Sequence, residues 1–177
     1  MRWRLGARTR KIVLLVHIAS AGAWLGIDVV MGVFVFTALL TADDRIKALS
    51  FQALELFAPR TLFTAGTVCL ISGVVLSLSS RYGLVRYWWV AAKLVLNVVL
   101  TGLVPLSLSP GLTEAAEQAR QFVAGGTAAL TVGDLIFPPI VSPTALLVAM
   151  VLAVFKPWGR IPWRRISWRR RQHPSTA

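Results

Sequence analysis

The chain has 177 residues, of which 56% are hydrophobic and only 15% are charged, and its formal net charge is +12. A soluble domain usually carries about 25% charged residues. Here the charges fall mainly between long apolar blocks, which excludes an ordinary soluble globular domain. A charge of this size would suggest nucleic-acid binding in a soluble protein, but most of the basic residues flank the apolar blocks. The single cysteine, Cys69, excludes an internal disulfide.

Four apolar blocks organise the chain, and each has roughly the 20 residues that a helix needs to cross a bilayer core. In lipid a helix satisfies its own backbone hydrogen bonds, and the blocks lack the period-two alternation of barrel strands. We therefore predict an all-α polytopic membrane protein, an up-down bundle of four transmembrane helices forming a single domain. The predicted spans are residues 12–40, 61–80, 88–108 and 136–155 of a domain covering 12–155, between basic tails at 1–11 and 156–177.

The first block follows a basic segment that ends at Lys11, as the apolar core of a secretory signal peptide also does. Its apolar run continues to Leu40, well beyond the roughly 7–15 residues of a cleaved signal. An uncleaved membrane helix is therefore predicted. Within this block, Gly22 and Gly26 form a GxxxG spacing. Small residues at this spacing allow close approach of helices, which predicts packing within one chain or between chains.

Two connecting segments are also predicted to be partly helical. Residues 41–60 place acidic residues at a helix start and repeat apolar residues at helical spacing, which predicts an outer amphipathic helix bent near Pro59. The Ser-Pro-Gly sequence at 109–111 is predicted to open a second outer loop. In that loop Thr113 would cap a short helix ending near Gly125. We interpret the second loop as a cover, with ligand binding as the alternative.

The fourth block is irregular because Pro138, Pro139 and Pro143 all fall in its first half. Ser142 followed by Pro143 is typical of a helix start. Only about 20 Å of helix then remains before Phe155. The outer half of this block is therefore predicted to be kinked or unwound. Broken helices mark some transporter sites and also occur as plain kinks.

The distribution of basic residues predicts the orientation. The two tails and the segment 81–87 hold fourteen basic residues and no acidic ones, whereas the remaining loops hold four basic and six acidic residues. By the positive-inside rule, both termini are predicted to be cytoplasmic. An even number of spans agrees with this orientation, because three spans would place the basic tails on opposite sides.

The C-terminal tail interleaves tryptophan with arginine. Tryptophan favours the headgroup level of a bilayer, and arginine is attracted to anionic lipids. We predict that this tail lies on the anionic inner leaflet, with a docking site for a cytoplasmic partner or for nucleic acid as the alternatives. The residues are Trp163, Arg164, Arg165, Trp168, Arg169, Arg170 and Arg171.

Polar residues inside the membrane are costly and are therefore candidates for function. His17 and Lys93 lie about 9 Å and about 8 Å into the cytoplasmic half of their spans, so they share a level if their helices are neighbours. One interpretation is that the two residues form a polar site. The other is structural: His17 bonds a neighbouring helix, and the side chain of Lys93 snorkels toward the cytoplasmic surface. Asp28 and Arg60 belong to the outer half, where an ion pair between the first two spans or an outer functional site is expected.

Several short motifs resemble those of an uncharacterised family of bacterial four-helix membrane proteins, distantly similar to the copper-resistance-D type. They are Val16-His17, Trp24-Leu25-Gly26, the stretch 83–94 with Trp89-Val90 before Lys93, and the stretch 152–159 with Lys156-Pro157. The resemblance implies a four-helix protein of the bacterial plasma membrane. Some relatives are thought to bind haem through histidines on different helices, which implies His17 as a ligand. Block 136–155 contains no histidine.

Three functional hypotheses follow. The chain contains no phosphate loop, no dinucleotide fingerprint and no HExxH zinc motif, so we predict a protein without enzymatic activity, cofactor or metal. The first hypothesis is an accessory or assembly protein whose partner is a second copy or another membrane protein, and not nucleic acid. The second is a small transporter or a metal or proton conduit using Asp28, Lys93 and the broken fourth helix. The third is a haem- or quinone-linked redox protein using His17.

Overall fold

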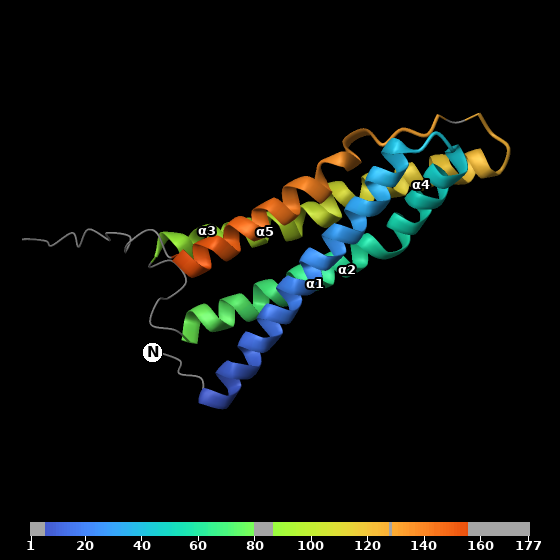
Figure 1. Cartoon of the computed structure of the whole chain (residues 1–177). Helices are drawn as coiled ribbons and strands as arrows, with labels where there is room; N and C mark the ends of the chain where they lie inside the picture. Colours follow the sequence, from blue (N-terminus) through green and yellow to red (C-terminus); the bar gives the residue numbers. More distant parts are fainter. Residues whose placement is uncertain (1–5, 80–86, 128, 156–177) are drawn as a thin grey trace, which may run out of the picture.

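The protein is a bundle of long helices in a computed structural model that describes residues 6–79, 87–127 and 129–155 (Figure 1). Four helical stretches are long and apolar enough to cross a membrane, and the described residues form no strands. The predicted all-α four-helix fold is therefore confirmed. In chain order the elements are α1 (Ala7–Leu40), α2 (Asp44–Ser79), α3 (Trp88–Leu103), the π-helix η1 (Val104–Leu108), α4 (Ser109–Val123), the 3-10 helix η2 (Gly133–Ile136) and α5 (Pro138–Phe155).

The predicted amphipathic helix and the second span form a single helix, α2. Its 36 residues extend about 54 Å at about 1.5 Å per residue, which exceeds a hydrocarbon core of about 30 Å. Pro59 lies inside the helix instead of ending it. The helical prediction for 41–60 is thus confirmed, and the first half of α2 forms a continuous extension of the membrane span.

The third span also continues without a break. We predicted a loop from Ser109, but α3, η1 and α4 follow one another directly, so the predicted cap at Thr113 is wrong. Pro105 and Pro110 therefore lie inside a continuous helical stretch, at the second positions of η1 and α4. The predicted end of this helix near Gly125 is confirmed, because α4 ends at Val123. Gly125 adopts a φ of 90°, a conformation that favours glycine.

The fourth span is helical from Pro138, so its first half is not unwound, and the alternative of a kink stays a prediction. Pro138 and Pro139 occupy the first turn, whose N–H groups have no partner inside the helix in any case. Pro143 lies inside α5, so Ser142 does not cap a helix start. Its side chain bonds another helix, as described below.

The four spans are packed tightly at one end of the bundle and separate at the other. Figure 1 shows the pair α1–α2 and the pair α3–α5 splaying apart toward the end at which α1 begins. The first half of α2 packs on α4, where Leu54, Ala58, Leu112 and Ala116 are fully buried. The core therefore lies in the middle of the bundle and around the α2–α4 pair.

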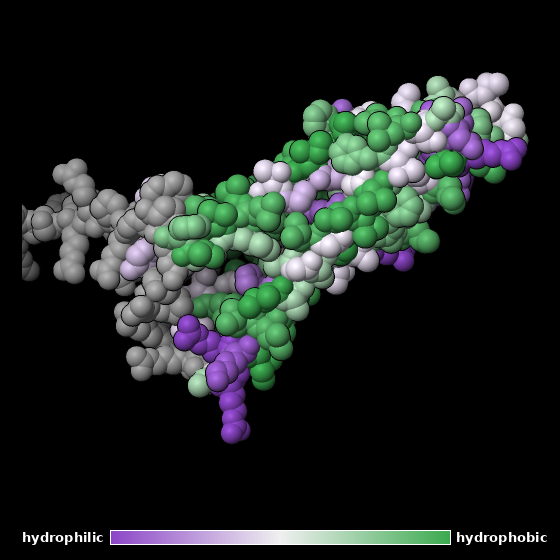
Figure 2. Space-filling view, viewed as in Figure 1, coloured by the Kyte–Doolittle hydropathy of each residue, from purple (hydrophilic) through white to green (hydrophobic). Residues whose placement is uncertain are grey.

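The two ends of the bundle differ in charge, and apolar surface lies between them. Figure 2 shows hydrophilic residues at the start of α1 and at the opposite end near α4, with largely hydrophobic surface along the flanks. We call the first the basic end, because it carries Arg8, Arg10 and Lys11, and the second the acidic end, because it carries Asp43, Asp44, Glu114 and Glu117. The exposed apolar flanks are the surface expected of helices in lipid.

Part of the predicted charge pattern lies outside the described residues. This applies to Arg2 and Arg4, to Arg81 and Arg86, and to the tail from Trp163 to Arg171. The predicted contact of that tail with anionic lipid therefore stays a prediction.

Candidate functional site

A cavity of about 640 Å³ lies between the four spans where they separate toward the basic end. Its volume falls within the range of about 300–1,000 Å³ that is usual for small-molecule sites. Residues of α1, α2, α3 and α5 all line it, and the hollow is visible in Figure 2 between the two splayed pairs of helices. We call it the four-helix cavity. Most of its lining is apolar, and its polar members are Arg10, His17, Cys69, Ser77, Lys93 and Asn97.

His17 and Lys93, predicted to share a level, both line this cavity. They come from α1 and α3, and His17 is half-buried. The ammonium of Lys93 lies 4.7 Å from the centroid of the Trp89 ring, an arrangement in which the ring face attracts the charge. The structure thus brings together the two polar residues that the sequence placed at the same depth.

The orientation of the His17 ring is fixed by α2. Its Nδ1 lies 3.0 Å from the carbonyl oxygen of Cys69 and 3.0 Å from the hydroxyl of Ser72. A carbonyl oxygen only accepts hydrogen bonds, so Nδ1 carries the proton that is donated to Cys69. In the neutral ring, Nε2 is then an acceptor and can bind a ligand.

A glycine of α2 makes room for this ring. A methyl group at Gly73 would lie 3.1 Å from Cε1 of His17, tighter than an ordinary van der Waals contact. The partners Cys69, Ser72 and Gly73 were not predicted, although serine, glycine and cysteine lie within five residues of one another in an otherwise apolar span.

Asp28 belongs to a separate polar network between α1 and α5. The indole nitrogen of Trp24 donates to the hydroxyl of Ser142 over 3.1 Å, and that hydroxyl donates to Oδ2 of Asp28 over 2.7 Å. Asp28 is 1% exposed, and its Oδ1 has no hydrogen-bond partner among the described residues. The expected ion pair between Asp28 and Arg60 does not form. Ser142 donates a hydrogen bond to the carboxylate of Asp28, and Arg60 is exposed.

Trp24 also lies where α1 and α2 pack closely. A methyl group at Gly66 of α2 would lie 2.8 Å from the Trp24 ring and 2.7 Å from Oγ1 of Thr101 on α3. Trp24 is also bonded to Ser142 on α5, so its side chain joins α1, α2 and α5, while Thr101 of α3 faces the same glycine. Gly66, Thr101 and Ser142 were not predicted, because their partners are distant in the sequence.

Gly22 and Gly26 do not pack within the chain. Both are exposed, and a methyl group added at either would meet nothing within 4 Å. The glycines that face neighbouring helices are instead Gly32, Gly66 and Gly73. Of the two expected roles for the GxxxG spacing, only packing between chains stays a prediction.

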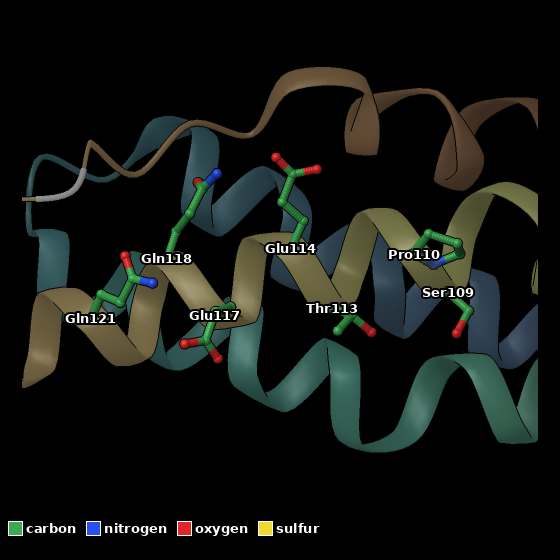
Figure 3. A pocket seen from close by; sticks show the side chains of 7 residues that line it. All are labelled: Ser109, Pro110, Thr113, Glu114, Glu117, Gln118 and Gln121. Carbon is green, nitrogen blue, oxygen red and sulfur yellow. The ribbon is translucent and has the colours of Figure 1, made fainter.

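A second hollow lies on the surface of α4 at the acidic end, with a volume of about 710 Å³. Its lining comes from the single stretch 109–121. Figure 3 shows that these side chains point to both sides of the helix and do not converge. Nearby, Arg120 bonds Glu55 of α2 over 2.7 Å and Glu117 over 2.9 Å, which links α4 to α2 on the surface. This surface has the features of helix packing and lacks a convergent set of ligand-binding groups.

The four-helix cavity is therefore the candidate site. Its lining combines apolar residues with polar groups from several helices, whereas the hollow on α4 is lined by a single helix. Comparison of the chain with protein-family models, with curated proteins and with solved structures found no match.

Proposed function

We propose that this chain is a non-enzymatic membrane protein that binds a small amphiphilic molecule in the four-helix cavity. The observation that carries the proposal is the cavity itself, with a volume of about 640 Å³ and a lining drawn from all four spans. A binding role also accords with the accessory function expected from the sequence. The orientation proposed with it places the basic end in the cytoplasm of a bacterium and the acidic end outside the plasma membrane.

Filling the cavity tests the proposal. Ala149 lines the cavity from α5, whereas its neighbour Val148 is 48% exposed and lies outside the lining. Protein purified in a mild detergent would be analysed by native mass spectrometry for lipid that remains bound. We expect bound lipid on the wild type and on Val148→Trp, and its loss from Ala149→Trp. Equal retention by the two tryptophan variants would contradict the proposal.

A redox role is the second candidate, and the orientation of His17 supports it. A metal-binding histidine usually donates its second ring N–H to a carbonyl or carboxylate, which is what Nδ1 of His17 does toward Cys69. The described residues offer one histidine, so they suit one axial haem ligand and not a bis-histidine site. Purified protein with a Soret band that disappears in His17→Ala would support this role, and a colourless protein would exclude haem.

A further inference from the structure

The four-helix cavity carries charge of only one sign. Arg10 and Lys93 line it, and no acidic residue does. The chain has seven acidic residues, six of which lie in or near the acidic end, while the seventh, Asp28, is bonded to Ser142 outside the lining. An anion in this cavity would therefore meet two cations and no opposing carboxylate.

The charged residues of the lining lie toward one end of the cavity. Arg10 lies three residues from the start of α1, and Lys93 lies five residues from the start of α3, so both are within about 8 Å of their helix ends. Farther along, the lining includes Ala21, Leu100 and Leu146, which are apolar. Leu100 is about 10 Å deeper than Lys93 along α3. The cavity is thus cationic near the basic end, and its depth is uncharged and mainly apolar, with Cys69 and Asn97 as its neutral polar members.

This order matches one chemical class. A free anion such as phosphate would leave the apolar depth unfilled, and an uncharged apolar molecule would gain nothing from the positive charge of Arg10 and Lys93. A lipid with an anionic headgroup satisfies both parts, since its phosphate is placed near the cations and its chains lie against the apolar wall. The hollow between the splayed helix pairs also reaches the apolar flank of the molecule, from which a lipid would enter (Figure 2).

We propose that the four-helix cavity selects an anionic phospholipid, with Arg10 and Lys93 making its end cationic and attracting the headgroup, and the apolar residues of all four spans holding the chains. This inference rests on the proposed binding function and specifies its ligand. Arg10 and Lys93 act as specificity-determining residues, because they decide which headgroup is accepted.

Competition between two lipids tests the selection. Detergent-purified protein is incubated with equal amounts of phosphatidylglycerol and phosphatidylcholine that have identical acyl chains, and the bound lipids are counted by native mass spectrometry. Each cation near a lipid surface contributes enough to favour the anionic lipid by about fivefold. We expect phosphatidylglycerol to dominate on the wild type, and Arg10→Gln and Lys93→Gln each to lose about fivefold of that preference.

Matched variants separate a local effect from a change in net charge or folding. Lys11 is adjacent to Arg10 and exposed but does not line the cavity, so Lys11→Gln should keep the wild-type preference. Lys93→Arg retains the charge and should keep it as well. Equal loss of preference in Lys11→Gln, or loss in Lys93→Arg, would overturn the assignment to these two residues.

The remaining outcomes distinguish the two proposals. If both lipids bind equally and Ala149→Trp removes both, the cavity binds lipid without selecting the headgroup, and this inference is overturned while the binding function stands. If no lipid binds to the wild type, the binding function itself is overturned. Inorganic phosphate should not displace the lipid. Displacement would show that the cavity binds the phosphate group alone and does not depend on the acyl chains, which would overturn the inference.

Discussion

Individual residues decide where the four spans touch. The indole of Trp24 reaches Ser142 on α5 and lies close to Gly66 on α2, which in turn faces Thr101 on α3. Gly66 has no side chain, and the space that a methyl group would need is already taken. The position therefore requires glycine for close packing and not for backbone conformation.

We expect Gly66→Ala to destabilise the protein by about 1–3 kcal/mol, the usual cost of overpacking a well-filled core. Thermal unfolding in detergent, followed by circular dichroism, measures the change. The matched control is Gly22→Ala, where a methyl group meets nothing within 4 Å. That variant should be unchanged or gain up to about 1 kcal/mol from its higher helix propensity. Equal stability of the two variants would refute the close packing at Gly66.

The network of Trp24, Ser142 and Asp28 gives a second prediction at this scale. Ser142→Ala removes the acceptor of the indole and the only donor to Asp28 among the residues that the structure describes. Leaving buried polar groups without partners costs about 1–3 kcal/mol, so the unfolding temperature should fall. In an Asp28→Ala background, the same change should cost less, with a coupling of about 0.6–1.7 kcal/mol as found between membrane helices. Strictly additive effects in this double-mutant cycle would show that the hydrogen bond contributes nothing.

At the scale of elements, the long helices divide into a membrane span and an extension. The first half of α2 packs on α4, and the buried side of this pair is built from leucine and alanine. Small alanines allow the two helices to approach closely, and Leu54 and Leu112 fill the space between them. The ion pairs of Arg120 lie on the exposed side of the same pair. Exposed pairs contribute roughly 0–1 kcal/mol, so packing and not charge holds the extension together.

Two leucines of α2 test this division. Leu54 is 0% exposed and Leu56 is 82% exposed, although they lie two residues apart. We expect Leu54→Ala to cost about 2–5 kcal/mol and Leu56→Ala to change stability by less than about 0.5 kcal/mol. Chemical unfolding of the two variants in the same detergent gives the comparison. If both cost the same, the α2–α4 pair does not form as described.

At the scale of the whole molecule, the distribution of charge predicts the orientation of the bundle. The basic end carries Arg8, Arg10 and Lys11, and the acidic end carries most of the carboxylates. Since basic residues are retained in the cytoplasm during insertion, we expect the connection between α1 and α2 to face the outside of the cell. The same orientation would place the cationic part of the four-helix cavity near the inner leaflet.

Cysteine labelling in intact cells tests this orientation. Cys69 is the only cysteine, so Cys69→Ala provides a background without thiols. In that background, Ala42→Cys and Thr127→Cys should react with a membrane-impermeant maleimide, while Arg8→Cys should react only after the cells are opened. Labelling of Arg8→Cys in intact cells would show that the orientation is the opposite one. The cavity would then receive lipid from the other leaflet.

The sequence predicts those features that depend only on residues close together in the chain. A span must match the thickness of the bilayer whatever its neighbours are, so the four helices were predicted and are confirmed. The end of α4 was predicted because Gly125 supplies a conformation that other residues rarely adopt. The break expected at Ser109 is wrong, and the first half of α5 is not unwound, although Pro105 and Pro110 lie inside the third span and Pro143 lies inside α5. Single-residue rules for proline did not account for helices that continue through such positions.

The sequence by itself determined that the chain crosses a membrane four times and where its charges concentrate, because hydropathy and charge act segment by segment. Only the tertiary structure decided that Asp28 bonds Ser142 and not Arg60, and that Gly66, not Gly22 or Gly26, faces a neighbouring helix. It also decided that His17 and Lys93 line one cavity. These pairings depend on the rotation and tilt of each helix, which are set by packing against its neighbours and not by the residues of any one span.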